Sequence, residues 1–420
     1  MELLNVIGRT YRKIFSIHEI ENESVLHWYF GYLIFSFALV YHGWIMNQNT
    51  AENVFGISGP TCWPFFQGCG DWIIFQTLPD GYSQQYVYMS LMAVMAGSVY
   101  AAIYKKWALA HFGVLILFAW KMYVTLIHFW YNANYDYYHT TFALIFLFLP
   151  HKRFFAMFAI VFFYFLSTAA KIHETWILGT YFTSLETGLP IFPDSLAPVF
   201  TNLVIVMEMV FAWFLLSRNM VLQRAAFIFF VVFHLYSGIL VGYHYPLIVL
   251  TPLLILFGPF YRPMEIPRDW KSIPGWSFAL ILLCLQMVSH VIPGDEKLTL
   301  EGNFYGLYMF EANHQCTIRV YDMQTGEAIR RHVSTNARSR CSPYAYLKRL
   351  QHHYCAHGNI KSGAKYGFSM EHSINGGPFY RIVKERDLCA LEYKPFQRNE
   401  WIKNYEDAEM IGRPVKNFYR

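Results

Sequence analysis

Nine apolar stretches fill most of the first 292 residues, and they constrain the fold more than any other feature. A membrane-crossing helix needs roughly 20 mostly apolar residues. The fourth and eighth stretches are short, so they are either tilted or broken spans or re-entrant pieces. We predict a polytopic α-helical membrane protein with about nine transmembrane helices, at residues 25–46, 84–104, 107–130, 137–150, 154–170, 199–217, 225–243, 245–259 and 273–292.

The boundary at Pro293-Gly294 separates regions suited to different solvents. Only 15% of the 420 residues are charged, whereas a soluble domain carries about 25%. Residues 1–292 hold 14 Lys/Arg and 14 Asp/Glu, and residues 293–420 hold the other 19 and 14. We therefore expect an N-terminal segment (1–24), either interfacial helix or polar tail, a transmembrane domain (25–292) and a C-terminal domain (293–420).

Basic residues give these spans an orientation. A cytoplasmic N-terminus places 12 of the 14 basic residues of the first 292 in cytoplasmic segments, as the positive-inside rule requires. The C-terminal domain then lies outside the cytoplasm, in the periplasm, a lumen or the exterior, where nucleic acid is excluded as a partner. The 12 residues are Arg9, Arg12, Lys13, Lys105, Lys106, Lys152, Arg153, Arg218, Arg224, Arg262, Arg268 and Lys271.

All but one of the seven cysteines fall on the outer side in this topology. An oxidising compartment favours disulfides. Six cysteines allow 15 pairings, so a bond within the 47–83 loop and a bond from that loop to the C-terminal domain both remain open. No Cys-x-x-Cys spacing occurs, so we predict no zinc site. The disulfide candidates are Cys62, Cys69, Cys316, Cys341, Cys355 and Cys389.

Three ionisable residues lie at membrane depth: Lys121, Lys171 and Glu208. Such residues usually face a cavity or a partner and indicate function by default. Lys121 is expected to be structural, paired with a carbonyl or an acid. Lys171 either snorkels to the outer headgroups or acts chemically, and Glu208 either contributes to a pocket or pairs with one of the two lysines.

The segment 171–198 is too polar to span the membrane and too apolar to be a free loop. We expect a re-entrant or interfacial stretch that carries Lys171. Partial removal from water disfavours the charged form of a lysine, so Lys171 could act as a base. A pocket of Tyr, Trp and Phe would suit a flat apolar ligand. Several histidines fall near the outer ends of the spans, without the spacing of a metal site: His128, His139, His173, His234, His244 and His290.

The C-terminal domain is predicted to be a small α+β unit. Residues 316–333 read as two strands joined by a Thr-Gly turn, and residues 344–355 read as a short amphipathic helix. Residues 367–383 form a second hairpin with Asn375-Gly376 at its tip. The domain contains neither a glycine-rich phosphate loop nor a nucleophile elbow.

Several segments of this chain resemble the vitamin K-dependent gamma-carboxylase family, also described as horizontally transferred transmembrane-domain proteins. The segment "YFLSTAAKIHETWILG" (164–179) places Lys171 where that family has the lysine thought to serve as base. Glu208 and "FHLYSG" (233–238) match an acid and a Phe-His segment in the following spans. The outer segments 303–327 and 373–402 are similar to the luminal portion of the family, including the Pro-Phe-Gln-Arg run (395–398) and Trp401.

The resemblance implies a reaction and a set of site residues. Lys171 would deprotonate a reduced vitamin K-type quinone, whose oxygenation to an epoxide drives removal of a γ-proton from a glutamate of a protein or peptide substrate, and CO2 then adds. Lys171 is the catalytic candidate. The candidates for the substrate pocket are Glu208, His234, His173, Trp176, Asn134 and His314.

The chain departs from the family at two histidines and in length. The animal enzymes have an Asn-His pair where this chain has Asn134-Tyr135, and a histidine early in the outer domain where the nearest residues here are Phe310 and Asn313-His314. His128, His139 or His314 could replace the missing imidazole. The C-terminal region is also shorter than in the animal enzymes, which puts a dedicated propeptide site in question.

Two functions are therefore compared. The first is a membrane enzyme that couples quinol oxygenation to carboxylation through Lys171. The second is a non-catalytic quinone- or lipid-binding protein, or an accessory subunit of a membrane complex, in which Lys171 and Glu208 merely pair.

Overall fold

A computed structural model describes residues 2–46, 61–72, 83–129, 134–242, 244–294, 296–308, 311–334, 340–355 and 365–412. The chain forms two compact units. Unit 1 comprises Met1–Tyr164 and Val210–Ile281, and unit 2 comprises Phe165–Met209 and Leu282–Arg420. The segment after the fifth apolar stretch thus belongs to the same unit as the C-terminal domain.

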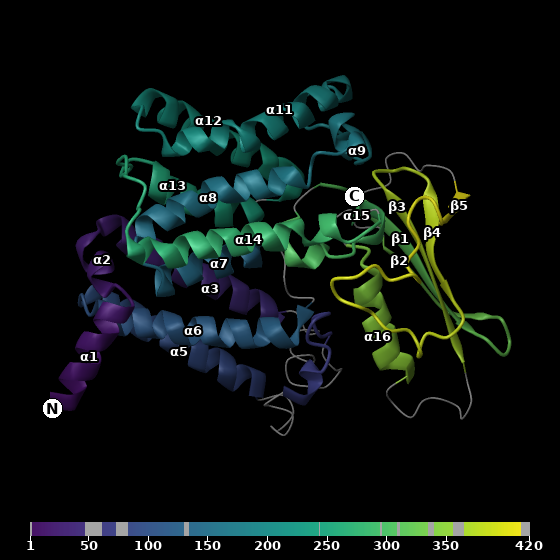
Figure 1. Ribbon diagram of the computed structural model, residues 1–420, viewed down its shortest axis with the longest axis horizontal. Helices are drawn as coiled ribbons and strands as arrows, with labels where there is room; N and C mark the ends of the chain where they lie inside the picture. The colour runs from purple at the N-terminus through teal and green to yellow at the C-terminus, as the bar shows by residue number, and fades with distance from the viewer. Residues whose placement is uncertain are drawn as a thin grey trace. The chain divides into compact units, whose positions relative to one another are not determined.

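Unit 1 is built from helices, as the long apolar stretches predict (Figure 1). Helices α8 and α14 cross from one unit into the other. The helices are α1 (Glu2–Ile14), α2 (Ile17–Asn22), α3 (Ser24–Met46), η1 (Cys69–Trp72), α5 (Ser83–Ile103), α6 (Trp107–Ile127), α7 (Asn134–Phe148), α8 (Lys152–Ala169), η4 (Phe211–Leu216), α12 (Met220–Val241), α13 (His244–Phe257), η5 (Trp270–Ser272) and α14 (Ile273–Val291).

Among the described residues, seven helical stretches are long and apolar enough to cross a bilayer. Each of the nine predicted stretches coincides with helix, but α7 and α13 have only 15 and 14 residues. These two are the stretches that the sequence marks as short. The seven long stretches are Ser24–Gly43, Tyr86–Ile103, Trp107–Ile127, Lys152–Ala169, Asp194–Leu216, Met220–Leu240 and Trp270–Val291.

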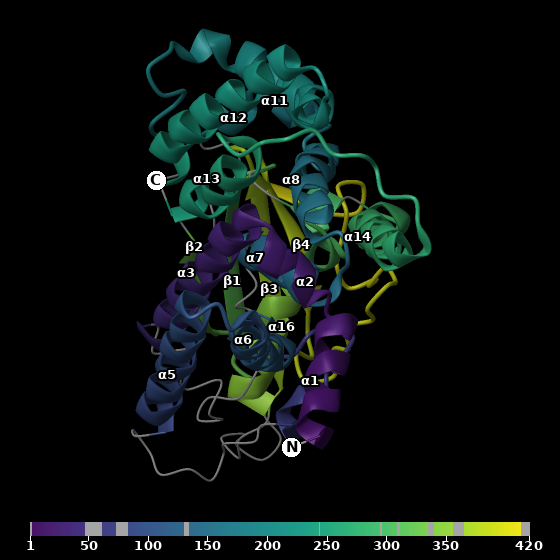
Figure 2. The same cartoon turned by 90° about the vertical axis from the view of Figure 1, so that its left-hand side faces the viewer.

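Hydrogen bonds from tyrosine hydroxyls and close packing at a glycine join helices of unit 1. Tyr29 on α3 donates to the carbonyl of Phe142 on α7, and Tyr32 donates to the carbonyl of Ile248 on α13, both at 3.0 Å. Helices α5 and α6 lie side by side in both views (Figure 2). A side chain at Gly113 would collide with Ser98, so the glycine permits this close approach.

The intramembrane Lys121 is paired, as predicted. Its ammonium group lies 3.2 Å from both the carbonyl and a carboxylate oxygen of Asp136, and 2.9 Å from Nδ1 of His139. All three side chains are buried. Because an unpaired charge at this depth would be costly, the cluster ties α6 to α7.

Unit 2 combines short helices with one antiparallel sheet. The strand order is β2-β1-β3-β4-β5, and α16 lies beside the strands (Figure 1). Its elements are α9 (Glu174–Ile177), α10 (Thr180–Thr183), η3 (Asp194–Leu196), α11 (Ala197–Met209), α15 (Glu296–Thr299), η6 (Asn303–Tyr305), β1 (His314–Asp322), β2 (Ala328–Ser334), α16 (Pro343–Cys355), β3 (Tyr366–Ile374), β4 (Phe379–Glu385) and β5 (Glu409–Gly412).

Both hairpins of the C-terminal domain are confirmed. Strands β1 and β2 pair across a turn in which Gly326 has a φ of 73°, and β3 and β4 pair across Asn375-Gly376, with φ of 49° and 69°. Asparagine and glycine adopt this left-handed conformation most easily. The Thr-Gly and Asn-Gly turns therefore predicted which strands pair.

Six cysteines form three disulfides: Cys62–Cys69, Cys316–Cys341 and Cys355–Cys389. Of the two arrangements left open by the sequence, the bond within the 47–83 loop is the one formed. Cys284 on α14 is free and exposed. Each disulfide closes within a single unit.

Helix α8 begins at a carboxylate supplied by α2. Glu19 accepts hydrogen bonds from the backbone N–H groups of His151 at 2.9 Å and Lys152 at 2.8 Å. These N–H groups have no carbonyl partner within the helix, and the helix dipole also favours a negative charge there.

Replacement of Glu19 by alanine is therefore expected to destabilise the protein by about 1–2 kcal/mol. The midpoint of thermal unfolding in detergent measures the change. Glu21→Ala is the matched control, because Glu21 makes an exposed ion pair with Arg12 that should contribute less than about 1 kcal/mol. Equal losses in the two variants would contradict the capping role.

Candidate functional site

Lys171 follows directly after α8 and is only 3% exposed. Its ammonium group pairs with Oε2 of Glu208 on α11, and the hydroxyl of Thr168 donates to the same oxygen at 2.9 Å. The ammonium also lies 5.7 Å from the centre of the Trp176 ring. Lys171 thus points to an acid and an aromatic face inside unit 2 and does not snorkel to the surface.

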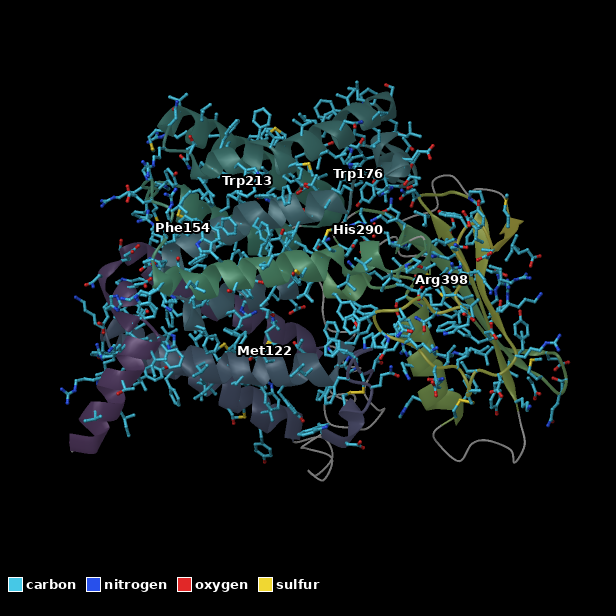
Figure 3. All side chains as sticks on the ribbon, viewed as in Figure 1. Met122, Phe154, Trp176, Trp213, His290 and Arg398 are labelled. Carbon is cyan, nitrogen blue, oxygen red and sulfur yellow. A yellow bond between two sulfur atoms is a disulfide. The ribbon has the colours of Figure 1, made fainter. Side chains whose placement is uncertain are left out.

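The segment after Lys171 begins with two short helices, α9 and α10. Trp176 is buried on α9, and its indole N–H donates to the carbonyl of Thr201 on α11 at 3.1 Å (Figure 3). Gly179 has a φ of 76°, and a Cβ there would lie 2.6 Å from the backbone nitrogen of Pro198. Only glycine permits this crossing of two backbones.

His173 uses both of its ring nitrogens. Nε2 lies 3.0 Å from the carbonyl oxygen of Glu311, and Nδ1 lies 2.9 Å from the hydroxyl of Thr175. Burial is the main cause that lowers the pKa of His173, and the charge of Lys297 adds to it. His173 is therefore neutral at physiological pH and occupied by hydrogen bonds.

His314 at the start of β1 pairs with His372 on β3, with 3.0 Å between Nδ1 and Nε2. Nδ1 of His372 donates to the carbonyl of Leu298 at 2.7 Å, so its Nε2 accepts from His314. Burial lowers the pKa of His372 to about 4 and lowers that of His314 well below its ordinary value. His314 thus keeps its Nε2 lone pair.

Basic groups surround His314. The charges of Arg340 and Lys297 contribute to its lowered pKa, after burial and His372. The ammonium of Lys297 lies 3.0 Å from Glu296 and 5.1 Å from the centre of the Tyr308 ring. This part of unit 2 therefore contains both basic groups and an acid, Glu296, that pairs with Lys297.

The remaining pocket candidates lie in unit 1. His234 on α12 forms a 2.5 Å hydrogen bond with the hydroxyl of Tyr164, and Asn134 is the first residue of α7. Unit 2 brings together Lys171, Glu208, Trp176, His173 and, through Glu311 and β1, His314. Phe310 lies outside the described residues.

The Pro-Phe-Gln-Arg run of the family resemblance is anchored by a buried carboxylate. One oxygen of Glu301 accepts from the backbone N–H and the side-chain amide of Asn399, both at 2.8 Å. The ring of Phe396 stacks on Tyr305 at 4.7 Å. The loop 394–399 therefore depends on residues that follow α14.

Several residues of this region could not be identified from the sequence: Thr175, Lys297, Glu301, Glu311, Asn313, His372 and Asn375. Asn375 carried a turn signal, and the others carried none. Among the described residues, no group of three His, Cys, Asp or Glu side chains could hold a metal ion. Comparison with protein-family models, with curated proteins and with solved structures finds no match to this chain.

Glu301 should make stability depend on pH. Burial raises its pKa from an ordinary value of 4.5 to about 7. The protonated form is therefore favoured in the folded state, and the stabilisation, which is complete below pH 4.5, is lost as the pH rises through 7.

We expect Glu301→Gln, which keeps the acceptor oxygen, to be more stable than the native chain by about 1–3 kcal/mol at pH 8 and by little or nothing at pH 4.5. Thermal unfolding in detergent at the two pH values measures the difference. A gain that does not change with pH would contradict the protonation of Glu301.

Proposed function

We propose that this protein is a membrane enzyme of the gamma-carboxylase type, in which Lys171 and Glu208 form the base. The observation that carries the proposal is the buried ion pair between these two side chains. The family resemblance of residues 164–179, 303–327 and 373–402 supports it, since Lys171 occupies the position of the base in that family.

The pair can take up a proton even though Lys171 faces an acid. Two charges removed from water each carry a desolvation penalty of several kcal/mol. Transfer of a proton from Nζ of Lys171 to Oε2 of Glu208 removes both charges at once. The neutral amine can then accept a proton from a substrate hydroxyl, and the hydroxyl of Thr168 remains a donor to the Glu208 side chain.

Aromatic side chains that follow Lys171 support a reduced quinone as the ligand. Trp176, Tyr181 and Phe182 are buried in the segment that follows the lysine, and such rings suit a flat apolar ligand. A reduced naphthoquinone would supply, through oxygenation to its epoxide, the driving force for removal of a γ-proton from glutamate. Lys171 would bind its hydroxyl, and Trp176 would exclude water from the amine.

The basic groups near His314 support a protein or peptide substrate. A glutamate side chain is anionic, and Lys297 and Arg340 provide positive charge within the same unit. His314 would present its Nε2 lone pair to such a substrate and so replace the imidazole that animal carboxylases carry elsewhere.

The alternative is a quinone- or lipid-binding or accessory protein in which the same ion pair only joins α8 to α11. The specific observation in its favour is that Lys171 is fully paired. The two functions differ in whether the lysine must lose a proton, and this difference can be tested by substitution.

Lys171→Ala and Lys171→Arg are both expected to lower quinol epoxidation and carboxylation by about 10²–10⁴-fold, because neither provides an amine that can act as a base. Purified protein with reduced vitamin K, labelled bicarbonate and a glutamate peptide provides the assay. Lys403→Ala, at an exposed lysine of the same unit, is the matched control. Epoxidation at the native rate by Lys171→Ala would exclude the enzyme, whereas stable but inactive Lys171→Arg would exclude a merely structural pair.

We further propose nine spans, a cytoplasmic N-terminus and an extracytoplasmic C-terminal domain. The distribution of basic residues, the helices at all nine stretches and the three disulfides support this topology.

An epitope tag inserted into the exposed β1–β2 turn, at residue 325, should bind antibody on intact cells. The same tag between Lys105 and Lys106 should bind only after the membrane is permeabilised. Flow cytometry of cells that express the full chain measures both. The reverse pattern would overturn the orientation, and access to both tags on intact cells would overturn the span count.

A further inference from the structure

The turn between β3 and β4 contacts the segment that carries Lys171. Asn375 opens this turn with a φ of 49° and lies 200 residues from its partner Thr175. Both residues belong to unit 2. The contact therefore joins the sheet of the C-terminal domain to the helical turns that follow α8.

Asn375 extends the ladder between β1 and β3 by one further pair. Its backbone N–H donates to the carbonyl of Asn313 at 2.9 Å, and its side-chain oxygen accepts from the N–H of Asn313 at 2.8 Å. Because a backbone N–H can only donate, the oxygen of the Asn375 amide must face Asn313. The NH2 group consequently faces Thr175, whose hydroxyl oxygen lies 3.0 Å away.

The direction of each hydrogen bond follows from this orientation. The NH2 group of Asn375 donates, so the hydroxyl oxygen of Thr175 accepts and its hydrogen remains available. The neighbour of that hydroxyl is Nδ1 of His173, at 2.9 Å. Nε2 of His173 faces a carbonyl oxygen, that of Glu311, and must carry the ring proton. Nδ1 is then an acceptor, and Thr175 donates to it.

This relay ends at the backbone of Lys171. The N–H of His173 donates to the carbonyl of Lys171 at 3.0 Å, so the residue that carries the imidazole is also hydrogen-bonded to Lys171 through its backbone. A second clamp acts further along the segment, where the side-chain amide of Asn313 donates to the carbonyl of Tyr181 at 2.7 Å and to the hydroxyl of Ser184 at 3.0 Å. Asn375 of the β3–β4 turn and its ladder partner Asn313 thus hold the two ends of the segment 173–184.

We propose that Asn375 is a positioning residue for Lys171, acting through the hydroxyl of Thr175 and the Nε2–H tautomer of His173. The inference deepens the proposed function and rests on it for the role of Lys171. The relay itself depends only on the geometry of unit 2. A protein substrate that binds to the sheet domain would affect the position of Lys171 through this turn.

The charges that act on His173 come from Lys297, Glu296 and Glu311. Burial and the ammonium of Lys297 oppose protonation of the imidazole, and the two acids favour it. The hydroxyl of Thr175 adds a donor at Nδ1, which stabilises the neutral ring. Loss of that donor, or a new acid at position 375, weakens the bias toward the neutral form.

Asn375→Asp tests the relay with almost no change in shape. A carboxylate can still accept from Asn313 but cannot donate to Thr175, so the hydroxyl turns to the carboxylate and leaves Nδ1 without a donor. Thr175→Val removes the hydroxyl that donates to Nδ1 without adding a charge, and Thr175→Ser keeps this hydroxyl. Asn404→Asp is the matched control, since Asn404 caps an exposed turn of the same domain through its oxygen alone.

The readouts are the 15N shifts of histidine-labelled protein in detergent, with His173 assigned from His173→Gln, and the pH profile of quinol epoxidation. We expect the native chain, Thr175→Ser and Asn404→Asp to show a neutral Nε2–H form of His173. Asn375→Asp should raise the pKa of His173 by at least about one unit. Asn375→Asp and Thr175→Val should lower kcat at least about tenfold with a shifted pH profile, in folded protein.

Three results would each overturn the proposal or a part of it. An Nδ1–H tautomer in the native chain would refute the relay, whatever the activity. Unchanged kcat and pH profile in Asn375→Asp and Thr175→Val, with Lys171→Ala inactive, would refute the positioning role and leave the proposed function intact. An active Lys171→Ala would refute the proposed function and with it the positioning role, while the histidine spectra would still decide whether the relay exists.

Discussion

A lysine and a glutamate buried against each other, Lys171 and Glu208, are the constraint on which the rest of unit 2 depends. Removal of one partner would leave an uncompensated charge away from water, at a cost of about 3–5 kcal/mol. The ion pair therefore fixes the position of the segment after α8 relative to α11. Trp176 bonds to the same helix as the acid, and Gly179 lets the two backbones cross at contact distance.

Ring nitrogens of the histidines His173, His314 and His372 in this unit are engaged in hydrogen bonds. His173 carries its proton on Nε2 and accepts at Nδ1, while His372 passes a hydrogen bond from His314 to a carbonyl. A ring held in one tautomer by two partners orients its neighbours more effectively than it accepts a proton from a substrate. The role of base therefore falls in our proposal to Lys171, whose ammonium group is paired with Glu208.

Much of the architecture could be predicted from the sequence, because the signals are local. Apolar stretches of about 20 residues predicted the helices, and Thr-Gly and Asn-Gly turns predicted the two hairpins of the sheet. An ionisable residue in an apolar stretch needs a partner, so the pairings of Lys121 with an acid and of Lys171 with Glu208 were among the expected outcomes.

The rest of the site depends on contacts that no local pattern encodes. Asn375 and Thr175 are polar residues of ordinary type that meet across 200 positions. The break of the sixth stretch at Val210, directly after the helix that carries Glu208, also has no proline or glycine to mark it. Such features follow from tertiary packing. The grouping of residues 165–209 with the C-terminal part of the chain also depends on contacts between residues that are distant in the sequence.

The three disulfides join cysteines that are 7, 25 and 34 positions apart in the sequence. In each bond the partner is the next disulfide cysteine along the chain. A chain made from its N-terminus can therefore complete each native pair with the next such cysteine to be made, and no pair needs a partner from a distant part of the chain.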